Sequence, residues 1–498
     1  MLFNTVASYG AADLEDLGPG EAVLVRDNWD DYGFKTTFDL YCHNGAYAIY
    51  VGEVKIGHRG MQAGRVTFPE GTTHLADEYF SLGVDESYYA KLRDEFEEET
   101  RLTILHSLRD VAYDTVLLDL IENERVMADS LLRGTDIDTV RGQFNRIANG
   151  GPTRSKFHVR YRQESLAENC PDLHLDLKVD PDAKPPSNIH ALIGSNGVGK
   201  TRLLHSIAHV TLSRRSKSSG GHLADMAERR VHPFNNVVYV SFSAFDAKSP
   251  HRTRHQEVGY QYVGLQTEKG HKDPRALAAE FADCVESCLT TNRATAERWR
   301  RVLKRLEETD TAFCDLEVIQ LGKLMDGQSP HAKLMFSSFS SGHAIVLLTL
   351  ARIVLHTTER TLVLIDEPEA HLHPPLLSTF VRILSEILAD RNGVAIVATH
   401  SPVVLQETPR DAVWALRRSG EDMRANHPEI ETFGENIGVI TREIFGLEVR
   451  RTGFNRMIQD LARQGMSFDE ILDEFDDRLG AEGRALARSA TRRRGGEV

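Results

Sequence analysis

The sequence predicts an α/β protein: a mostly parallel sheet flanked by helices and interrupted by a helical insertion, with a smaller α+β domain ahead of it. Two observations carry this prediction. In the second half, apolar runs alternate with amphipathic stretches, as in NIHALIG before RLLHSIAHV and TLVLIDE before a helical pattern from Pro374. Before residue 150, short β-like runs give way to apolar residues at helical spacing. The 498 residues suffice for two or three domains.

Three segments are expected along the chain. Residues 1–150 read as an N-terminal α+β accessory domain, because AVLVRD and AYAIYVGEVKIG alternate with turn residues before helical patterns at 85–148. The segment NGGPTRSK at 149–156 is the expected linker to a main domain at 155–410, with a helical insertion at about 211–330. Residues 411–498 are expected to form an α-rich C-terminal extension.

Composition narrows the functional classes. A net charge of −14 and a pI near 5.8 argue against a surface dominated by nucleic-acid binding. Five scattered cysteines are typical of a reducing compartment. The N-terminus lacks the pattern of a signal peptide, and the longest apolar run, AIVLLTLARIVLH, is shorter than the roughly 20 residues of a membrane-spanning helix. We therefore expect a cytoplasmic protein with no membrane partner.

The stretch GSNGVGKT, residues 194–201, matches the pattern G-x-x-x-x-G-K-[ST] between a predicted strand and a predicted helix. Glycines let backbone N–H groups curl around a phosphate, and the helix that follows presents its positive end to the anion. Lys200 would reach the β/γ oxygens of a nucleoside triphosphate, and Thr201 would ligate Mg²⁺. The alternative is a glycine-rich turn with no ligand. The predicted nucleotide-binding residues are Gly194, Asn196, Gly197, Gly199, Lys200 and Thr201.

Two predicted strands end in residues suited to phosphate chemistry. LVLIDEP at 362–368 describes a buried strand whose carboxylates lie at its C-terminal end, where α/β sheets bind ligands. Asp366 would hold Mg²⁺, and Glu367 would orient and deprotonate a water molecule. GVAIVATH ends in His400, which could donate to the γ-phosphate. The sequence thus predicts Glu367 and His400 as catalytic residues, Thr201 and Asp366 as metal ligands, and a nucleoside triphosphate with Mg²⁺ as the bound species. A solvated turn and a structural histidine are the alternatives.

A second anion site is predicted in FSSFSSGHAIVLLTLARIVLH. Ser340, Ser341 and Gly342 precede a strongly apolar helix, and hydroxyls with free N–H groups at a helix N-terminus bind anions. The alternative is an ordinary helix cap. One chain rarely needs two such sites for one nucleotide.

Taken in order, GSNGVGKT, FSSGH, LVLIDEPEAHLHP and IVATHSP resemble the Walker A loop, signature motif, Walker B with D-loop, and switch histidine of ABC-type ATPases, over about residues 155–410. The chain looks like the soluble RecF, SMC and OLD-like branch of that class, and resembles bacterial anti-phage defence ATPases such as the Septu-system ATPase. The resemblance implies an ABC-type P-loop ATPase domain that works as a dimer or higher oligomer. Two subunits would sandwich ATP, with Ser340, Ser341 and Gly342 acting in trans.

The resemblance implies an ATP-hydrolysing switch, slow or regulated by a partner, that controls a separate effector such as a nuclease in anti-phage defence. An alternative is an ATPase of the RecF or SMC type that acts directly on DNA. A third reading, a nucleotide-binding scaffold with very slow hydrolysis, is opposed by the intact Glu367. The candidate DNA phosphate contacts are Arg214, Arg215, Lys217, Arg293, Arg298, Arg300, Arg301, Lys304 and Arg305.

The chain departs from the family pattern in two places. FSSGH replaces LSGGQ, so that Ser341 and His343 stand where glycine and glutamine are usual. No glutamine occupies the expected Q-loop position. The nearby polar residues are Ser243, Asp246, Gln256 and Gln261. We interpret Cys284 and Cys288 as core residues, and His371 and His373 as D-loop residues outside any metal site.

Overall fold

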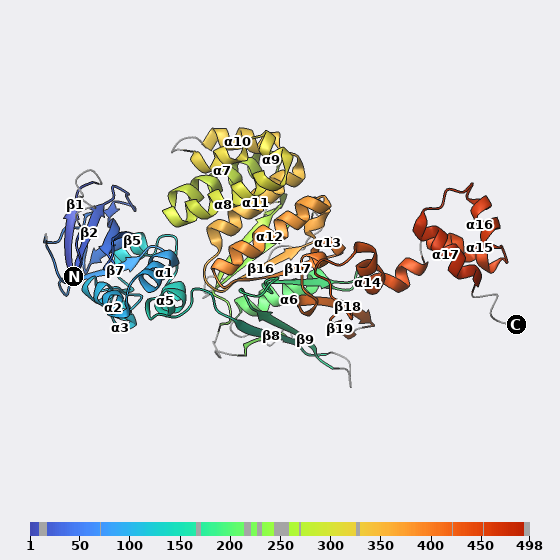
Figure 1. The fold of residues 1–498 in the computed structure, drawn as a ribbon, viewed down its shortest axis with the longest axis horizontal. Helices are drawn as coiled ribbons and strands as arrows, with labels where there is room; N and C mark the ends of the chain where they lie inside the picture. The colour runs from blue at the N-terminus through green and yellow to red at the C-terminus, as the bar shows by residue number, and fades with distance from the viewer. Residues whose placement is uncertain are drawn as a thin grey trace.

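The computed structural model describes residues 1–8, 17–69, 71–165, 171–213, 221–226, 232–243, 258–267, 270–324, 329–420, 422–451 and 453–492. Along the chain, an α+β N-terminal part is followed by a central sheet with helices on both faces. A group of C-terminal helices then lies beyond α14 (Figure 1).

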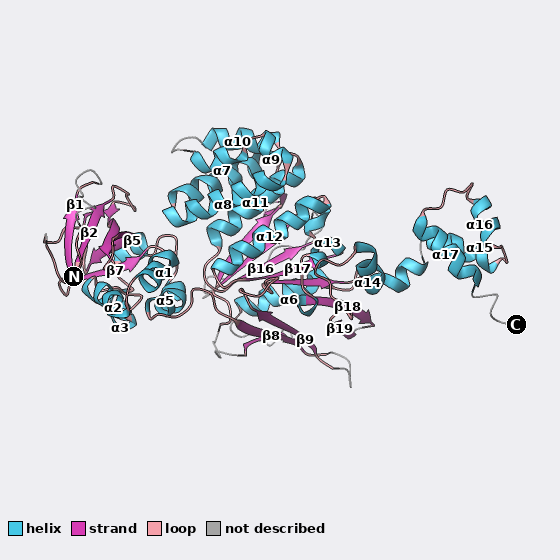
Figure 2. Cartoon of the chain, in the orientation of Figure 1, coloured by secondary structure: helices cyan, strands magenta, loops and turns pink. Residues whose placement is uncertain are grey.

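The N-terminal part is built on a five-stranded sheet of order β1-β2-β4-β5-β7 (Figure 2). Within this sheet β1 and β2 pair in parallel, and the other neighbours pair antiparallel. Helix α1 begins where the Asp85 side chain accepts the N–H groups of Ser87 and Tyr88, which satisfies donors at the helix start. The strands are β1 (Leu2–Val6), β2 (Glu21–Arg26), β3 (Phe34–Lys35), β4 (Thr37–His43), β5 (Ala48–His58), β6 (Gly64–Arg65) and β7 (Tyr79–Gly83). The helices are α1 (Glu86–Glu95), α2 (Glu98–Ser107), α3 (Thr115–Ile121), η2 (Met127–Leu131), α4 (Ile137–Thr139), η3 (Val140–Phe144) and α5 (Asn145–Ala148).

The central sheet has seven strands in the order β13-β12-β16-β17-β10-β18-β19. All neighbours run parallel except β18 and β19. The C-terminal ends of β10, β16 and β17 therefore meet at one edge. The strands are β10 (Ile189–Ile193), β12 (Asn236–Ser241), β13 (Gly259–Gly264), β16 (Thr361–Asp366), β17 (Val394–Thr399), β18 (Val413–Ser419) and β19 (Asp422–Asn426).

Both faces of this sheet are covered, which explains why its inner strands are apolar without alternation. On β16, Val363 and Ile365 pack with the residues of α11 (Ser341–His356) and α12 (Pro374–Asp390). Leu362 and Leu364 pack on the other side with α6 (Lys200–Leu212) and a small antiparallel sheet. That sheet consists of β8 (Phe157–Gln163), β9 (Leu173–Val179) and β11 (Gly221–Asp225), in the order β11-β8-β9.

The segment expected as a helical insertion begins with strands. β11, β12 and β13 join sheets, because runs such as NVVYVS are rich in β-branched and aromatic residues. Within the described part of this segment, the helices that follow begin at Pro274, and they stand above α11 and α12 in Figure 1. Cys284 and Cys288 are buried in the core there, as predicted. The remaining elements are β14 (Gln266–Thr267), β15 (Gly270–His271), α7 (Pro274–Thr290), α8 (Arg293–Thr309), α9 (Thr311–Asp315), η4 (Val318–Lys323) and α10 (Ser329–Ser338).

The residues after 410 are not helical throughout, since β18 and β19 extend the central sheet. Helices α15, α16 and α17 share a small core of their own around Ile458 and Ile471. Among the described residues, none of the helices combines the length and apolar character required to cross a membrane. The other elements of this region are η5 (Pro368–Ala370), α13 (Pro402–Gln406), η6 (Arg410–Ala412), α14 (Ile437–Arg451), α15 (Gly453–Arg463), α16 (Phe468–Glu474) and α17 (Ala481–Arg492).

The N-terminal part contacts the central sheet at the N-terminal ends of its strands. This is opposite the edge where β16 ends. Arg391, just after α12, lies 2.7 Å from the Glu86 carboxylate of α1. Arg146 lies 3.0 Å from the buried Glu359, which precedes β16. These buried ion pairs join the two parts of the chain at a distance from the phosphate loop.

Candidate functional site: the carboxyl edge of the central sheet

The segment between β10 and α6 has the backbone of a phosphate-binding loop. Gly197 and Gly199 have φ angles of 77° and 109°, a region that side chains disfavour. A Cβ on Gly194 would lie 2.7 Å from the Leu416 carbonyl oxygen of β18, so only glycine fits there. Helix α6 begins at Lys200, and its free N–H groups therefore face the loop.

Lys200 is buried, and its ammonium group lies at the centre of the site. Its Nζ donates to the carbonyl oxygen of Gly194 at 3.0 Å and to that of Ser195 at 3.4 Å. It also lies 2.7 Å from Nε2 of His400. Burial lowers the pKa of Lys200, while nearby carboxylates, Glu367 foremost, act in the opposite direction. The lysine is held close to the positions that phosphate oxygens would take.

The acid pair lies at the end of β16. Asp366 is buried between its register partners Ser241 on β12 and Ala398 on β17. At Glu367 the strand ends, since this residue adopts a left-handed conformation with φ of 47° and donates its N–H to the Ala398 oxygen at 2.9 Å. Its Oε1 lies 3.0 Å from Nε2 of His400.

His400 links the three motifs. Its backbone N–H donates to the Glu369 carboxylate, and its Nε2 faces both the Lys200 ammonium and the Glu367 carboxylate. One ring nitrogen cannot accept from lysine and donate to glutamate at once. Only one of these two hydrogen bonds can therefore form at a time. Three residues from distant parts of the sequence thus converge at one sheet edge.

A cavity of about 380 Å³ opens beside this cluster. Thr201 and Asp366, the two predicted Mg²⁺ ligands, both line it together with Glu367. An oxygen-rich pair beside a glycine cradle and a buried lysine fits a magnesium triphosphate. The other lining residues come from β12, β16, α11, α12 and the segments between them: Val240, Phe242, Ser243, Leu265, Ile345, Val346, Thr349, Ile365, Pro368, Ala370, His371, Leu372 and Phe380.

The predicted second anion site starts α11. Ser340 is its N-cap and accepts the His343 N–H at 3.4 Å, while Ser340 and Ser341 are exposed. Gly342 is buried against the segment after β16, where a Cβ would lie only 2.4 Å from the His371 carbonyl oxygen. Gly342 therefore contacts the D-loop segment of its own chain.

The predicted DNA contacts are mostly engaged within the protein. Arg298 is 6% exposed, which rules it out as a phosphate contact. Arg301 pairs with Asp390, and Arg305 pairs with Glu386. The other contacts are Arg293 with Glu297, Arg300 with the Gly322 oxygen, and Lys304 with Glu308. Arg214, Arg215 and Lys217 lie outside the described residues.

Two of the four polar residues near the expected Q-loop position lie within the described part of the chain. Ser243 follows β12 and lines the cavity beside Asp366. Gln261 lies on β13, paired with Val238, one strand further from the acid pair. Asp246 and Gln256 lie outside the described residues.

Sequence reasoning missed several polar residues. The Glu369 carboxylate accepts the backbone N–H of His400. In the sequence, the repeated acids of DEPE were the only sign of a role for Glu369. Asp310, His343 and His373 form a cluster, although the sequence had predicted His373 to be a D-loop residue outside any metal site. Because these three residues lie far apart in the sequence, their spacing gives no sign of the cluster.

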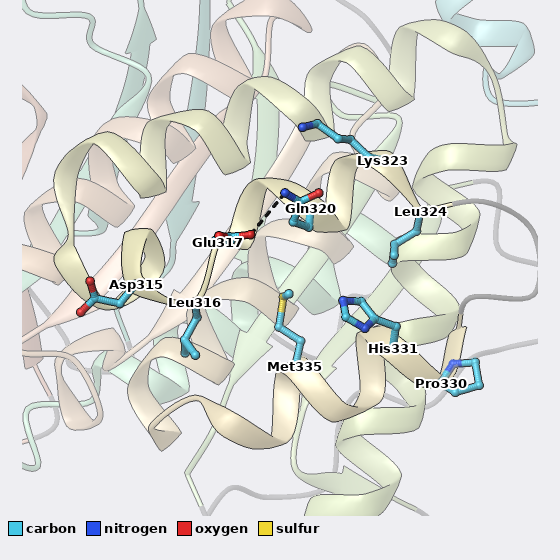
Figure 3. Close-up of a pocket in the computed structure, with 9 residues that line it drawn as sticks. All are labelled: Asp315, Leu316, Glu317, Gln320, Lys323, Leu324, Pro330, His331 and Met335. Atoms are coloured by element: carbon cyan, nitrogen blue, oxygen red, sulfur yellow. Dashed lines mark hydrogen bonds between the residues drawn. The ribbon is translucent and has the colours of Figure 1, made fainter.

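A separate cavity of about 820 Å³ lies in the insertion, between α9, η4 and α10 (Figure 3). Glu317 and Gln320 lie next to each other in its lining at the start of η4, where Nε2 of the glutamine donates to the carboxylate at 3.4 Å. None of its lining residues belongs to the central sheet: they are Asp315, Leu316, Glu317, Gln320, Lys323, Leu324, Pro330, His331 and Met335. It is not part of the site at the sheet edge.

These features confirm the predicted fold class, an ABC-type P-loop ATPase domain with a smaller α+β N-terminal part. Residues 305–406, from α8 to α13, match the family described as "AAA domain, putative AbiEii toxin, Type IV TA system". The likeness to the Septu-system ATPase stays a prediction.

Solved structures similar to this chain include an ATP-binding cassette of an ABC transporter in its ADP conformation, with 13% identity and a TM-score of 0.31 over 59% of this chain and 99% of that one. The cassette cbiO1 from Clostridium perfringens has 14% identity and a TM-score of 0.32 over 61% and 98%. The SMC head domain from Thermotoga maritima has 10% identity and a TM-score of 0.31 over 55% and 100%. Likeness at this level carries no functional argument.

The similarity found by comparing sequences extends over almost the whole chain. Protein ea59 of Escherichia phage lambda is 36% identical over 503 residues, which cover 94% of this chain and 94% of that protein. The chain belongs to the family of phage lambda protein ea59.

Proposed function

We propose that the chain binds ATP with Mg²⁺ and hydrolyses it, and that this cycle operates a switch. The observation that carries the proposal is the convergence of Lys200, Glu367 and His400, with Nζ and Oε1 lying 2.7 Å and 3.0 Å from the same imidazole nitrogen. A buried lysine, a carboxylate and an imidazole beside a glycine cradle are what phosphoryl transfer to water requires.

Each residue has a role that its position supports. Lys200 and the N–H groups at the start of α6 hold the phosphates, while Thr201 and Asp366 hold Mg²⁺. The metal ion would neutralise charge on the phosphate oxygens. Glu367 orients the attacking water and accepts its proton, and His400 donates to the γ-phosphate. Phosphate oxygens would take over Lys200 from its carbonyl and imidazole partners, which frees His400 for this role.

We also propose that two copies close around ATP, each placing Ser340, Ser341 and Gly342 against the nucleotide of the other. The support is that Ser340 and Ser341 are exposed at the N-terminus of α11, where hydroxyls and free N–H groups can bind an anion. Hydrolysis would reopen the pair. This movement would control a separate effector, such as a nuclease, in defence against phage.

Three variants test the chemistry. Glu367→Gln keeps the shape of the side chain but removes the base, so phosphate release should fall by about 10²- to 10⁴-fold while ATP still binds. Lys200→Ala should abolish binding of a fluorescent ATP analogue. Glu386→Gln is the control, because this exposed carboxylate on α12 pairs with Arg305 away from the site. If Glu367→Gln turns ATP over at the rate of Glu386→Gln, Glu367 is not the base.

Two further measurements test the switch. Light scattering of Glu367→Gln should show a dimer with ATP and a smaller species without it; a mass that ignores ATP would contradict the sandwich. Purification of the tagged chain from its host, with and without ATP, should recover an effector protein. If duplex DNA instead stimulates hydrolysis in a strongly salt-dependent way, the chain acts on DNA directly.

A further inference from the structure

A second cluster of ionisable side chains lies outside the phosphate site. Asp310 Oδ2 is 3.3 Å from His343 Nε2 and 3.7 Å from His373 Nε2. Ligand atoms of all three residues lie within 4.8 Å of one another. Three segments meet here: Asp310 joins α8 to α9, His343 lies in the first turn of α11, and His373 precedes α12.

The rest of each side chain is held so that these atoms face one point. The other oxygen of Asp310 accepts the Ala312 N–H at 2.9 Å. The other ring nitrogen of His343 lies 2.6 Å from Ser340 Oγ. Metal-binding histidines are commonly oriented in this way, by a hydrogen bond from the nitrogen that does not touch the metal. His343 also packs edge-on against Phe313, with ring centroids 4.9 Å apart.

We propose that Asp310, His343 and His373 bind a divalent transition metal ion of the Zn²⁺ class. Ligand atoms about 2.0–2.1 Å from a tetrahedral ion are separated by roughly 3.3 Å, close to the two distances to Asp310. Two imidazoles favour Zn²⁺, Co²⁺ or Ni²⁺ over Mg²⁺, which prefers oxygen ligands. The His373 side chain is 52% exposed, so the ion can enter from solvent and keep a water molecule as its fourth ligand.

Metal binding would change which ring nitrogen carries the proton in His373, the N-cap residue of α12. His373 Nδ1 now accepts the Leu376 N–H at 3.3 Å at the start of α12. If Nε2 binds the ion, the ring proton moves to Nδ1 and this long hydrogen bond is lost. The Leu376 N–H then loses its acceptor, whereas Pro374 at the first position of the helix has no N–H that needs one. The cost is therefore small beside two metal–nitrogen bonds and one metal–oxygen bond.

The site also bears on the signature residues, a step that rests on the proposed function. With Nε2 on the metal, His343 carries its proton on Nδ1 and donates it to Ser340 Oγ. The Ser340 hydroxyl proton is then free to donate to a phosphate of the partner copy. Occupancy of the metal site would thus favour closure of the ATP-bound pair.

The test uses the full-length chain, stripped of metal and without nucleotide. Co²⁺ added to it should produce visible d–d absorption that saturates at one ion per chain and is displaced by Zn²⁺. Asp310→Asn and His373→Asn retain helix caps, and His343→Gln restores the usual residue of the signature motif. Each should weaken Co²⁺ binding by at least about tenfold. His371→Asn is the matched control, an exposed histidine two residues from His373 and outside the cluster.

Two results would overturn the site: no saturable Co²⁺ spectrum in the parent chain, or equal weakening in His371→Asn. The link to nucleotide is measured separately, by light scattering of Glu367→Gln with ATP, with and without Zn²⁺. We expect Zn²⁺ to lower the ATP concentration needed for dimerisation, and expect His343→Gln to abolish that effect. If the parent chain binds Zn²⁺ but dimerises alike in both conditions, the link fails and the site stands. If Co²⁺ does not bind while ATP still drives dimerisation, the metal site fails and the proposed function stands.

Discussion

Substitution of Gly342 by alanine tests whether the start of α11 must touch the D-loop segment. A Cβ at this position would lie 2.4 Å from the His371 carbonyl oxygen, and the next atoms, His371 C and Leu372 Cδ2, lie at 3.5 Å and 3.7 Å. The conflict is therefore with one backbone oxygen. Side-chain movement cannot relieve it, so the helix and the segment after β16 must separate.

The size of the separation follows from the distance. Ordinary contact for a Cβ begins at 3.4 Å, so the gap must widen by about 1 Å from 2.4 Å. Overpacking of this kind costs about 1–3 kcal/mol. Alanine recovers up to about 1 kcal/mol through its helix propensity, less at a helix end. We expect a net loss of about 1–2 kcal/mol, or roughly 2–8 °C in the melting temperature of a domain of this size.

The assay is differential scanning fluorimetry of Gly342→Ala beside Ser341→Ala. Ser341 is the exposed neighbour, and its change should stay within about 0.5 kcal/mol of the parent. A displacement of about 1 Å at the signature should also lower ATP turnover by roughly 10²-fold. If Gly342→Ala melts as Ser341→Ala does, and turns over ATP as the control Glu386→Gln does, α11 and the D-loop segment are not in the contact described here.

Three further predictions concern pH, packing and metal. Burial lowers the pKa of His190 on β10 to about 3 from 6.5. Below pH 6.5 the unfolded chain binds a proton at this residue and the folded chain does not, so the free energy of unfolding falls by about 1.4 kcal/mol per pH unit from pH 6.5 toward pH 3. His190→Gln should flatten this decline in thermal melts. An equally steep decline in the variant would assign it to other groups. Trp299 on α8 is fully buried beside Phe281, so Trp299→Ala should cost about 3–5 kcal/mol in thermal unfolding, whereas a loss under 1 kcal/mol would mean that α8 is not packed as described. Chelation of Mg²⁺ should stop phosphate release, and Asp366→Asn should raise the Mg²⁺ concentration needed to restore it; restoration at the parent concentration would remove Asp366 as a ligand.

The parts of the site that follow from sequence are those encoded within one short segment. Glycines, lysine and threonine lie within eight residues of a strand-to-helix junction, and backbone geometry then sets the loop. Asp366 and His400 were predictable because each follows an apolar strand, and parallel strands bring their carboxyl ends to one edge. The left-handed turn at Glu367 was not predictable, since glutamate has no local preference for it.

Tertiary packing decided the features that sequence could not give. The arginines of α8 form a basic run in the sequence, but the fold buries Arg298 and pairs Arg301 and Arg305 with acids of α12. Strands β18 and β19 joined the sheet although the C-terminal region was expected to be α-rich. In both cases the outcome depends on contacts between segments distant in sequence, which periodicity does not report.

Helix α12 runs from the cluster of Asp310, His343 and His373 to the contact with the N-terminal part. His373 caps its N-terminus beside Asp310, and Arg391, just past its C-terminus, lies 2.7 Å from Glu86 of the N-terminal part. A helix of 17 residues spans about 25 Å and moves as a unit when its apolar face is packed. Any change at the cluster or the D-loop segment that shifts the start of α12 therefore displaces the ion pair with Glu86 as well. We therefore expect the N-terminal part, which is joined past the C-terminal end of this helix, to respond to changes at the sheet edge without contacting the proposed nucleotide.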